Sequence, residues 1–162
     1  MKITEQEKIR LQKLADIYLI EESYEVMFES IDPDNHYDFE HIRKNLWTFT
    51  DRKGVKCFLI IHQSLYKGNT KAEVKFGWID ENSKERYDKP SSYDVRIYNT
   101  FVYIFLNEIL KHYSEYFTEF HLEAIDPLRH RLYRQTLNNF LDFNKFSLEE
   151  LPDKNILIIK VL

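Results

Sequence analysis

The sequence predicts an α+β or α/β fold in which a mixed, mostly antiparallel sheet carries helices on both faces. Residues 46–80 form segments of alternating apolar and polar side chains, which is typical of half-buried strands. Two later segments, about 94–113 and 127–143, space their apolar residues along one face of a helix. Because a strand-like segment follows each of these helices, strands and helices alternate in the second half, and this order predicts a mixed sheet.

Composition predicts one domain over residues 1–162, with a helical N-terminal part up to about residue 45. Of the 162 residues, 43% are hydrophobic and 31% charged, enough for a packed core in a soluble protein. The N-terminus lacks a signal peptide's apolar core, and no apolar run reaches the ~20 residues that span a bilayer. A cytoplasmic protein with no membrane contact is therefore expected. The single cysteine, Cys57, excludes an internal disulfide and a multi-cysteine metal site.

The first third of the chain is expected to be mainly helical. A capping box of the Thr-x-x-Glu type begins a helix over residues 4–22. Residues 23–28 (SYEVMF) fit either a continued helix or a short strand. Residues 32–35 (DPDN) have the composition of a turn, and residues 36–46 (HYDFEHIRKNL) are interpreted as helical.

A β-hairpin and a third strand follow. Residues 46–50 and 55–64 are its two strands, and DRKG between them predicts the turn. Residues 65–70 (LYKGNT) are expected to connect to a third strand at residues 71–80 (KAEVKFGWID). A polar stretch without glycine, residues 81–92, comes next.

The remaining chain predicts two helices and two strands. A largely buried helix begins near residues 91–94 and runs to about Tyr113. A strand at 117–125 leads directly into a helix at 127–143. A polar connection then ends at Pro152, and NILIIKVL closes the chain as a strand covered on both faces.

The junction between that strand and helix gives the clearest local signal. Asp126 stands at the N-cap, and Pro127 occupies the first helical position, where its missing N–H costs nothing. The apolar stripe of the helix consists of Leu128, Leu132, Tyr133, Leu137, Phe140 and Leu141. Three arginines lie off this stripe: Arg129, Arg131 and Arg134. Because the net charge is −4, these arginines are interpreted as a solvated face, and nucleic acid is not expected as a partner.

Three pieces of the chain, between about residues 46 and 141, carry a further signal. They are the strands VKCFLIIHQS and KAEVKFGWID, the long helix YDVRIYNTFVYIFLNEIL, and the junction IDPLRHRLYRQTLNNF. In this order they resemble the GNAT superfamily of acyl-CoA N-acyltransferases. More narrowly, NTFVYIFLNEIL followed by D-x-x-R-x-R-L-Y is similar to GNAT-like proteins of unknown function found in bacteria and phages.

The resemblance implies a GNAT-like fold and, in an active member, an acyl-CoA whose pyrophosphate binds at a Gln/Arg-x-x-Gly-x-Gly/Ala loop. The corresponding segment here, residues 84–95, contains no glycine, and Pro90 removes one backbone amide. We therefore expect a binding or interaction module without standard acyl-CoA chemistry and without a cofactor. Two alternatives remain open: an active N-acyltransferase that uses acetyl-CoA, and a toxin–antitoxin or phage-defence component. A homodimer or another protein partner stays open as well.

Three residues are candidates for catalysis. The resemblance implies that Tyr133 protonates the leaving thiolate, whereas core packing is the other interpretation of this side chain. Glu123 and His121 share one face of the predicted strand, where either could act as a general base. The alternative for both is a solvated sheet face or an ion pair with a nearby arginine.

Three neighbouring residues form a candidate anion site. Asp126, Arg129 and His130 lie at the start of the later helix, whose free backbone amides favour negative charge. Asp126 also has its capping role in this interpretation. No metal site is expected, since the histidines lack a second ligand pair at suitable spacing.

Overall fold

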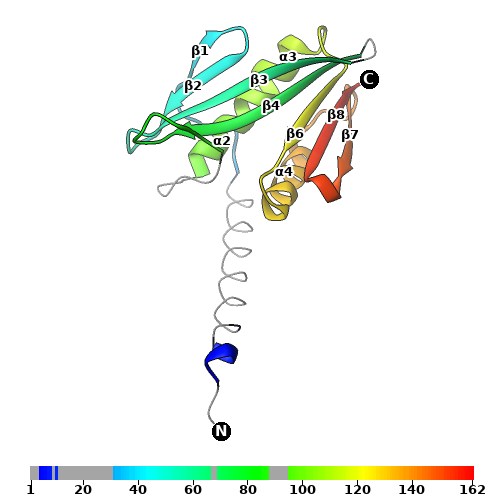
Figure 1. Ribbon diagram of the computed structural model, residues 1–162. Coiled ribbons are helices and arrows are strands. Elements are labelled where there is room, and N and C mark those ends of the chain that lie inside the picture. The colour runs from blue at the N-terminus through cyan, green and yellow to red at the C-terminus, as the bar shows by residue number, and fades with distance from the viewer. Residues whose placement is uncertain (1–3, 9, 11–30, 67–68, 88–94) are drawn as a thin grey trace.

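The structure is a computed structural model that describes residues 4–8, 10, 31–66, 69–87 and 95–162. The strands are β1 (Glu40–Arg43), β2 (Leu46–Thr50), β3 (Lys56–Tyr66), β4 (Asn69–Ile79), β5 (Glu85–Arg86), β6 (Glu119–Glu123), β7 (Phe146–Leu151) and β8 (Ile156–Val161). The helices are α2 (Val95–Tyr103), the π-helix η1 (Ile104–Ile109), α3 (Leu110–Tyr113), α4 (Pro127–Phe140) and the short 3-10 helix η2 (Pro152–Lys154). Within the described residues the strands form one open sheet in the order β1-β2-β3-β4-β6-β8-β7 (Figure 1). The short strand β5 pairs with β4.

One strand pair is parallel in this otherwise antiparallel sheet. β4 and β6 run side by side from the pair Lys71–Glu119 to the pair Val74–Leu122. The connection between them is the long helical segment α2–η1–α3, as a parallel pair requires. The prediction of a mixed, mostly antiparallel sheet is therefore confirmed.

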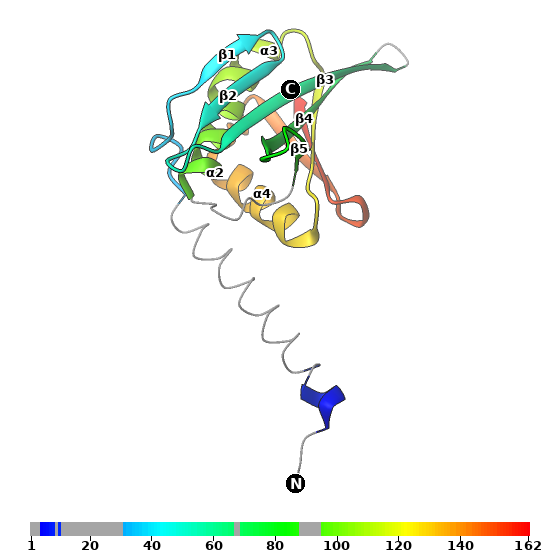
Figure 2. The same cartoon turned by 60° about the vertical axis from the view of Figure 1, so that its left-hand side comes forward.

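The prediction of helices on both faces is wrong for the described residues. Leu137 near the end of α4 and Leu141 just after it belong to the same buried cluster as Phe101 and Ile104 of the α2–η1 segment. The Tyr98 and Thr136 hydroxyls, 3.2 Å apart, also join α2 to α4. Figure 2 shows the two helices next to each other on one side of the strands. Helical periodicity marks which side of a helix is buried, but it does not say which face of the sheet covers it.

The sheet's side chains alternate between this covered face and an opposite face. The covered face is apolar and contributes Trp47, Phe49, Leu59, Ile61, Val74, Phe120, Leu122, Leu157 and Ile159 to the buried cluster. Across β4 and β6, the opposite face carries Lys71, Glu73, Glu119 and His121, which pair directly with one another. Phe58 is buried on that face, where its ring meets the Tyr87 ring edge-on at 5.8 Å.

The long helix is confirmed over residues 95–113, but its middle turn is wider than an α-helix. In η1 the backbone N–H of Leu110 donates to the carbonyl of Phe105, five residues earlier. Two polar residues of α2, Asn99 and Thr100, are fully buried. Their side chains accept from the N–H groups of Asp32 and Tyr37, respectively, and so hold the segment before β1 against the helix. The predicted start of this helix at residues 91–94 lies outside the described residues.

Several local predictions are confirmed. Thr4 and Glu7 each accept a hydrogen bond from the other's backbone N–H, as a capping box requires. The rest of the predicted N-terminal helix and residues 23–28 lie outside the described residues, apart from positions 5–8 and 10, which are helical. The turn at residues 32–35 is closed by Asn35 N–H donating to the Asp32 carbonyl at 2.9 Å.

Four segments differ from the prediction. Residues 36–46 are not helical, because they include β1 and the turn that joins it to β2. Residues 65–70 are not a simple connection, since Leu65 pairs with Thr70 and extends the hairpin. The polar stretch after β4 contains the short strand β5. The polar connection before Pro152 contains β7, which forms a hairpin with β8.

The strand-to-helix junction follows the prediction closely. Asp126 is the N-cap of α4 and accepts from the backbone N–H of Arg129 at 2.8 Å, and Pro127 is the first helical residue. The helix ends at Phe140, three residues before the predicted end, because Leu141 adopts an extended conformation and turns into the core.

Candidate functional site

A cleft lies where the parallel strands β4 and β6 separate. It has a volume of about 190 Å³. Its lining comes from β4, the residue after β5, the end of β6 and α4: Lys75, Phe76, Tyr87, Glu123, Ala124, Ile125 and Tyr133. The cleft therefore combines aromatic side chains with an exposed carboxylate and an exposed ammonium group.

The cleft exists because β5 and β6 share one edge of β4 without filling it. β6 pairs with β4 as far as Val74, whereas β5 pairs with it from Trp78 onward. β3 occupies the other edge, so in the described structure residues 75–77 have no strand partner on the cleft side. Gly77 permits this arrangement, since a Cβ there would lie 2.6 Å from the backbone oxygen of Arg86 in β5.

Tyr133 lies between the core and the cleft. Its ring stacks on Tyr98 with centroids 5.9 Å apart, and it meets Phe76 edge-on at 5.6 Å. The side chain is half-buried and also lines the cleft. Core packing and a role in the cleft are thus compatible for Tyr133, because its ring is held by aromatic neighbours and also lines the cleft.

The two candidate bases occupy different surroundings. Glu123 is exposed at the end of β6 and lines the cleft with Tyr133. His121 lies two residues earlier on the open face of the sheet, where Nε2 is 3.0 Å from Glu119 Oε1. Burial lowers the pKa of His121 below its usual value, and this effect exceeds the opposing attraction of the Glu119 carboxylate. The structure therefore brings Glu123, but not His121, to the cleft.

The three residues of the candidate anion site each have a contact within the protein. Asp126 caps α4, and the Arg129 guanidinium donates to the Tyr87 carbonyl at 3.0 Å. His130 is buried, with Nε2 3.0 Å from Glu150 on β7 and Nδ1 without a hydrogen-bond partner in the described structure. These contacts fix α4 against β7 and against the backbone after β5.

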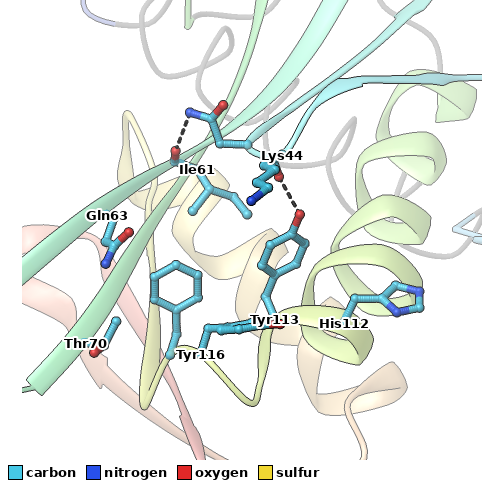
Figure 3. A pocket seen from close by; sticks show the side chains of 9 residues that line it. Lys44, Ile61, Gln63, Thr70, His112, Tyr113 and Tyr116 are labelled. Carbon is cyan, nitrogen blue, oxygen red and sulfur yellow. Dashed lines mark hydrogen bonds between the residues drawn. The ribbon is translucent and has the colours of Figure 1, made fainter.

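A second and larger pocket lies beside the beginning of β4 and the end of α3. Its volume is about 700 Å³, within the usual range for small-molecule sites. It is lined by Lys44, Asn45, Ile61, Gln63, Thr70, His112, Tyr113, Tyr116 and Phe117 (Figure 3). No candidate residue named from the sequence lies here, although this pocket is larger than the cleft.

Two hydrogen bonds shape the larger pocket. The Tyr113 hydroxyl donates to the Lys44 carbonyl at 2.6 Å, which ties α3 to the turn after β1 (Figure 3). The Asn45 amide donates to the Ile61 carbonyl at 3.2 Å. Burial raises the pKa of Tyr113, with smaller contributions from Tyr116 and a nearby glutamate, so the hydroxyl stays a donor at neutral pH. Sequence reasoning missed this pocket because its residues come from separated segments that carry no shared motif.

Within the described residues, no cluster of three His, Cys, Asp or Glu side chains is arranged to hold a metal ion. The described helices include none with the length and apolar character needed to cross a membrane. No protein-family model matches the chain, and neither a curated protein nor a solved structure matches it.

Proposed function

We propose that this chain is a GNAT-like domain that works as a binding or interaction module, with the cleft between β4 and β6 as its ligand site. The observation that carries the proposal is the parallel pair that separates after Val74 and leaves an edge of β4 open. The order of elements around it also supports a GNAT-like architecture, because a meander, a long helix, a parallel strand, a helix and a hairpin follow in turn.

Two features argue against standard acyl-CoA chemistry. The cleft volume of about 190 Å³ is below the roughly 300–1,000 Å³ of ordinary ligand pockets, which favours a small ligand or a narrow chain. The segment that would hold a pyrophosphate has no glycine, so a close approach of phosphate to successive backbone amides is hindered. A small ligand that is held by aromatic rings and one carboxylate fits both features.

An active N-acyltransferase is the second candidate, and one observation favours it. Tyr133 and Glu123, the implied acid and one of the two candidate bases, line the same cleft. In this reaction Glu123 would take a proton from the attacking amine, and the nitrogen would form a bond to the acyl carbon. The carbon–sulfur bond would then break, and the Tyr133 hydroxyl would protonate the departing thiolate.

Calorimetric titration with acetyl-CoA, combined with an assay for free thiol release in the presence of mixed amines, separates the two candidates. We expect no micromolar binding and no release of thiol. Micromolar binding with turnover would refute the binding-module proposal and support the acyltransferase. In that case Tyr133→Phe should reduce turnover at least about tenfold, whereas the exposed Tyr116→Phe should not.

A further inference from the structure

The larger pocket lies at the other end of the β4–β6 pair from the cleft. Thr70, at the beginning of β4, and Phe117, just before β6, line the pocket, whereas the cleft begins beyond Val74. Among the described residues, none lines both the larger pocket and the cleft. A ligand in the larger pocket would therefore be independent of the function proposed for the cleft.

The charge of this pocket differs from that of the whole chain. The chain has a net charge of −4, yet the described residues of the lining include Lys44 and no carboxylate. In the described part of the chain the Lys44 ammonium has no ion pair. The carboxylate of Glu108, on the helical segment beside the pocket, lies 3.7 Å from His112. His112 points away from Gln63 and Thr70 in Figure 3, so among the described lining residues Lys44 is the cation that remains available to a bound anion.

Two further polar groups are free to bind a ligand. Neither the Gln63 amide nor the Thr70 hydroxyl makes a hydrogen bond within the described residues. Figure 3 shows both on the left of the hollow, across from Tyr113 and Lys44. The amide can donate and accept, and the hydroxyl can do the same, so together they can orient a polar edge of a ligand.

Aromatic rings form the apolar part of the wall. The Tyr113 ring has its centroid 6.2 Å from that of Tyr116 and 6.4 Å from that of Phe117. Phe117 is buried, whereas Tyr116 is 67% exposed. An exposed ring at the rim can stack on a planar ligand, and such ring pairs attract each other beyond the effect of their buried area.

We propose that this pocket binds a small planar aromatic molecule that carries a carboxylate or a phosphate. Its ring stacks against Tyr116 and Tyr113, and its anionic group pairs with Lys44. Gln63 and Thr70 bind the polar edge on the opposite side of the hollow. A volume of about 700 Å³ holds a molecule the size of an indole acid or a nucleoside monophosphate.

Binding can be tested with two matched pairs of probes. Indole-3-acetate is compared with indole-3-acetamide, and adenosine monophosphate with adenosine, by NMR titration of the full chain. The two anions distinguish a carboxylate from a phosphate ligand. We expect one of them to bind with a dissociation constant on the order of 10⁻⁴ M, at least about tenfold more tightly than its uncharged partner.

Two variants test the proposed contacts with the ligand, and a third variant is the control. Lys44→Met and Tyr116→Ala should each weaken binding about tenfold or more, while Lys111→Met on the same helix as Tyr113 should not. All three positions are exposed, so unchanged melting temperatures will show that the fold is intact. The proposal is refuted if neither anion binds, if the uncharged partners bind equally well, or if Lys44→Met and Tyr116→Ala bind like the unmodified chain.

Discussion

Replacement of Gly77 by alanine is expected to destabilise the sheet where β5 joins it. A Cβ at this position would lie 2.5 Å from the Phe58 ring and 2.6 Å from the Arg86 carbonyl oxygen. Carbon atoms in favourable contact are about 3.5–4.0 Å apart, so the ring has to move by about 1 Å or more. The Arg86 oxygen belongs to the backbone, so relief of that contact requires β5 to move away from β4.

Overpacking of this kind costs about 1–3 kcal/mol of unfolding free energy. For a chain of this size each kcal/mol lowers the melting temperature by roughly 2–4 °C, so Gly77→Ala should melt about 2–12 °C lower. Thermal unfolding followed by circular dichroism measures the shift. Phe58→Leu removes one of the two clashes, and the double variant should therefore lose less stability than the sum of the single variants.

Gly54→Ala is the matched control. No atom lies within 4 Å of a Cβ there, but the backbone φ of +83° is strained for an L residue, which costs about 1–2 kcal/mol without any clash. Its loss of stability should be the same in the unmodified chain and in the Phe58→Leu variant, because the two sites do not touch. If Gly77→Ala melts within about 1 °C of the unmodified chain, the close approach of β5 to β4 does not exist.

Three further predictions concern α4 and the open sheet face. Asp126→Ala removes the hydrogen bond to the Arg129 N–H and should cost about 1 kcal/mol in urea unfolding, whereas Asp126→Asn, which keeps an acceptor, should cost less. Leu137→Ala opens a cavity in the core and should cost about 2–5 kcal/mol; a loss below about 1 kcal/mol would contradict its burial. Because burial lowers the pKa of His121 below 6.5, protons bind the unfolded chain more readily, so the unfolding free energy should fall as the pH drops below about 6.5. His121→Gln should flatten this dependence between about pH 7 and 5, and an unchanged slope would show that His121 is not its source.

The sequence was most informative where one residue type dictates a local conformation. Asp126 followed by Pro127 predicted the start of α4, and the turn residues after Thr50 predicted the β2–β3 hairpin. The edge strands were missed for a physical reason. All four residues of β1 are exposed, so it has no buried face and shows no alternation. In strand β7 only Phe146 is buried, and Ser147, Glu149 and Glu150 give the strand the polar composition of a loop.

Only the part of the candidate site that is formed by residues close together in the sequence could be predicted. Glu123 and Tyr133 are separated by ten positions and joined by a tight strand-to-helix turn, so their proximity follows from the junction itself. The larger pocket depends instead on long-range packing. Lys44, Thr70 and Tyr116 come together because the turn after β1, the beginning of β4 and the end of α3 are adjacent, and no short pattern in the sequence encodes that arrangement.

The π-helix η1 sets the phase between the two halves of the long helical segment. Each residue advances an α-helix by roughly 100°. Because the wide turn accommodates one additional residue, the side chains after it are rotated by about that angle relative to an unbroken α-helix of the same sequence. Phe101 therefore faces the sheet while Tyr113 faces the turn after β1. An unbroken α-helix of the same sequence would not place both side chains in this way. A one-residue deletion between Ile104 and Ile109 would remove that additional residue, so the turn would narrow to an α-helical one and Tyr113 would still face the Lys44 carbonyl. The wide turn therefore compensates for one additional residue and keeps Tyr113 in the wall of the larger pocket.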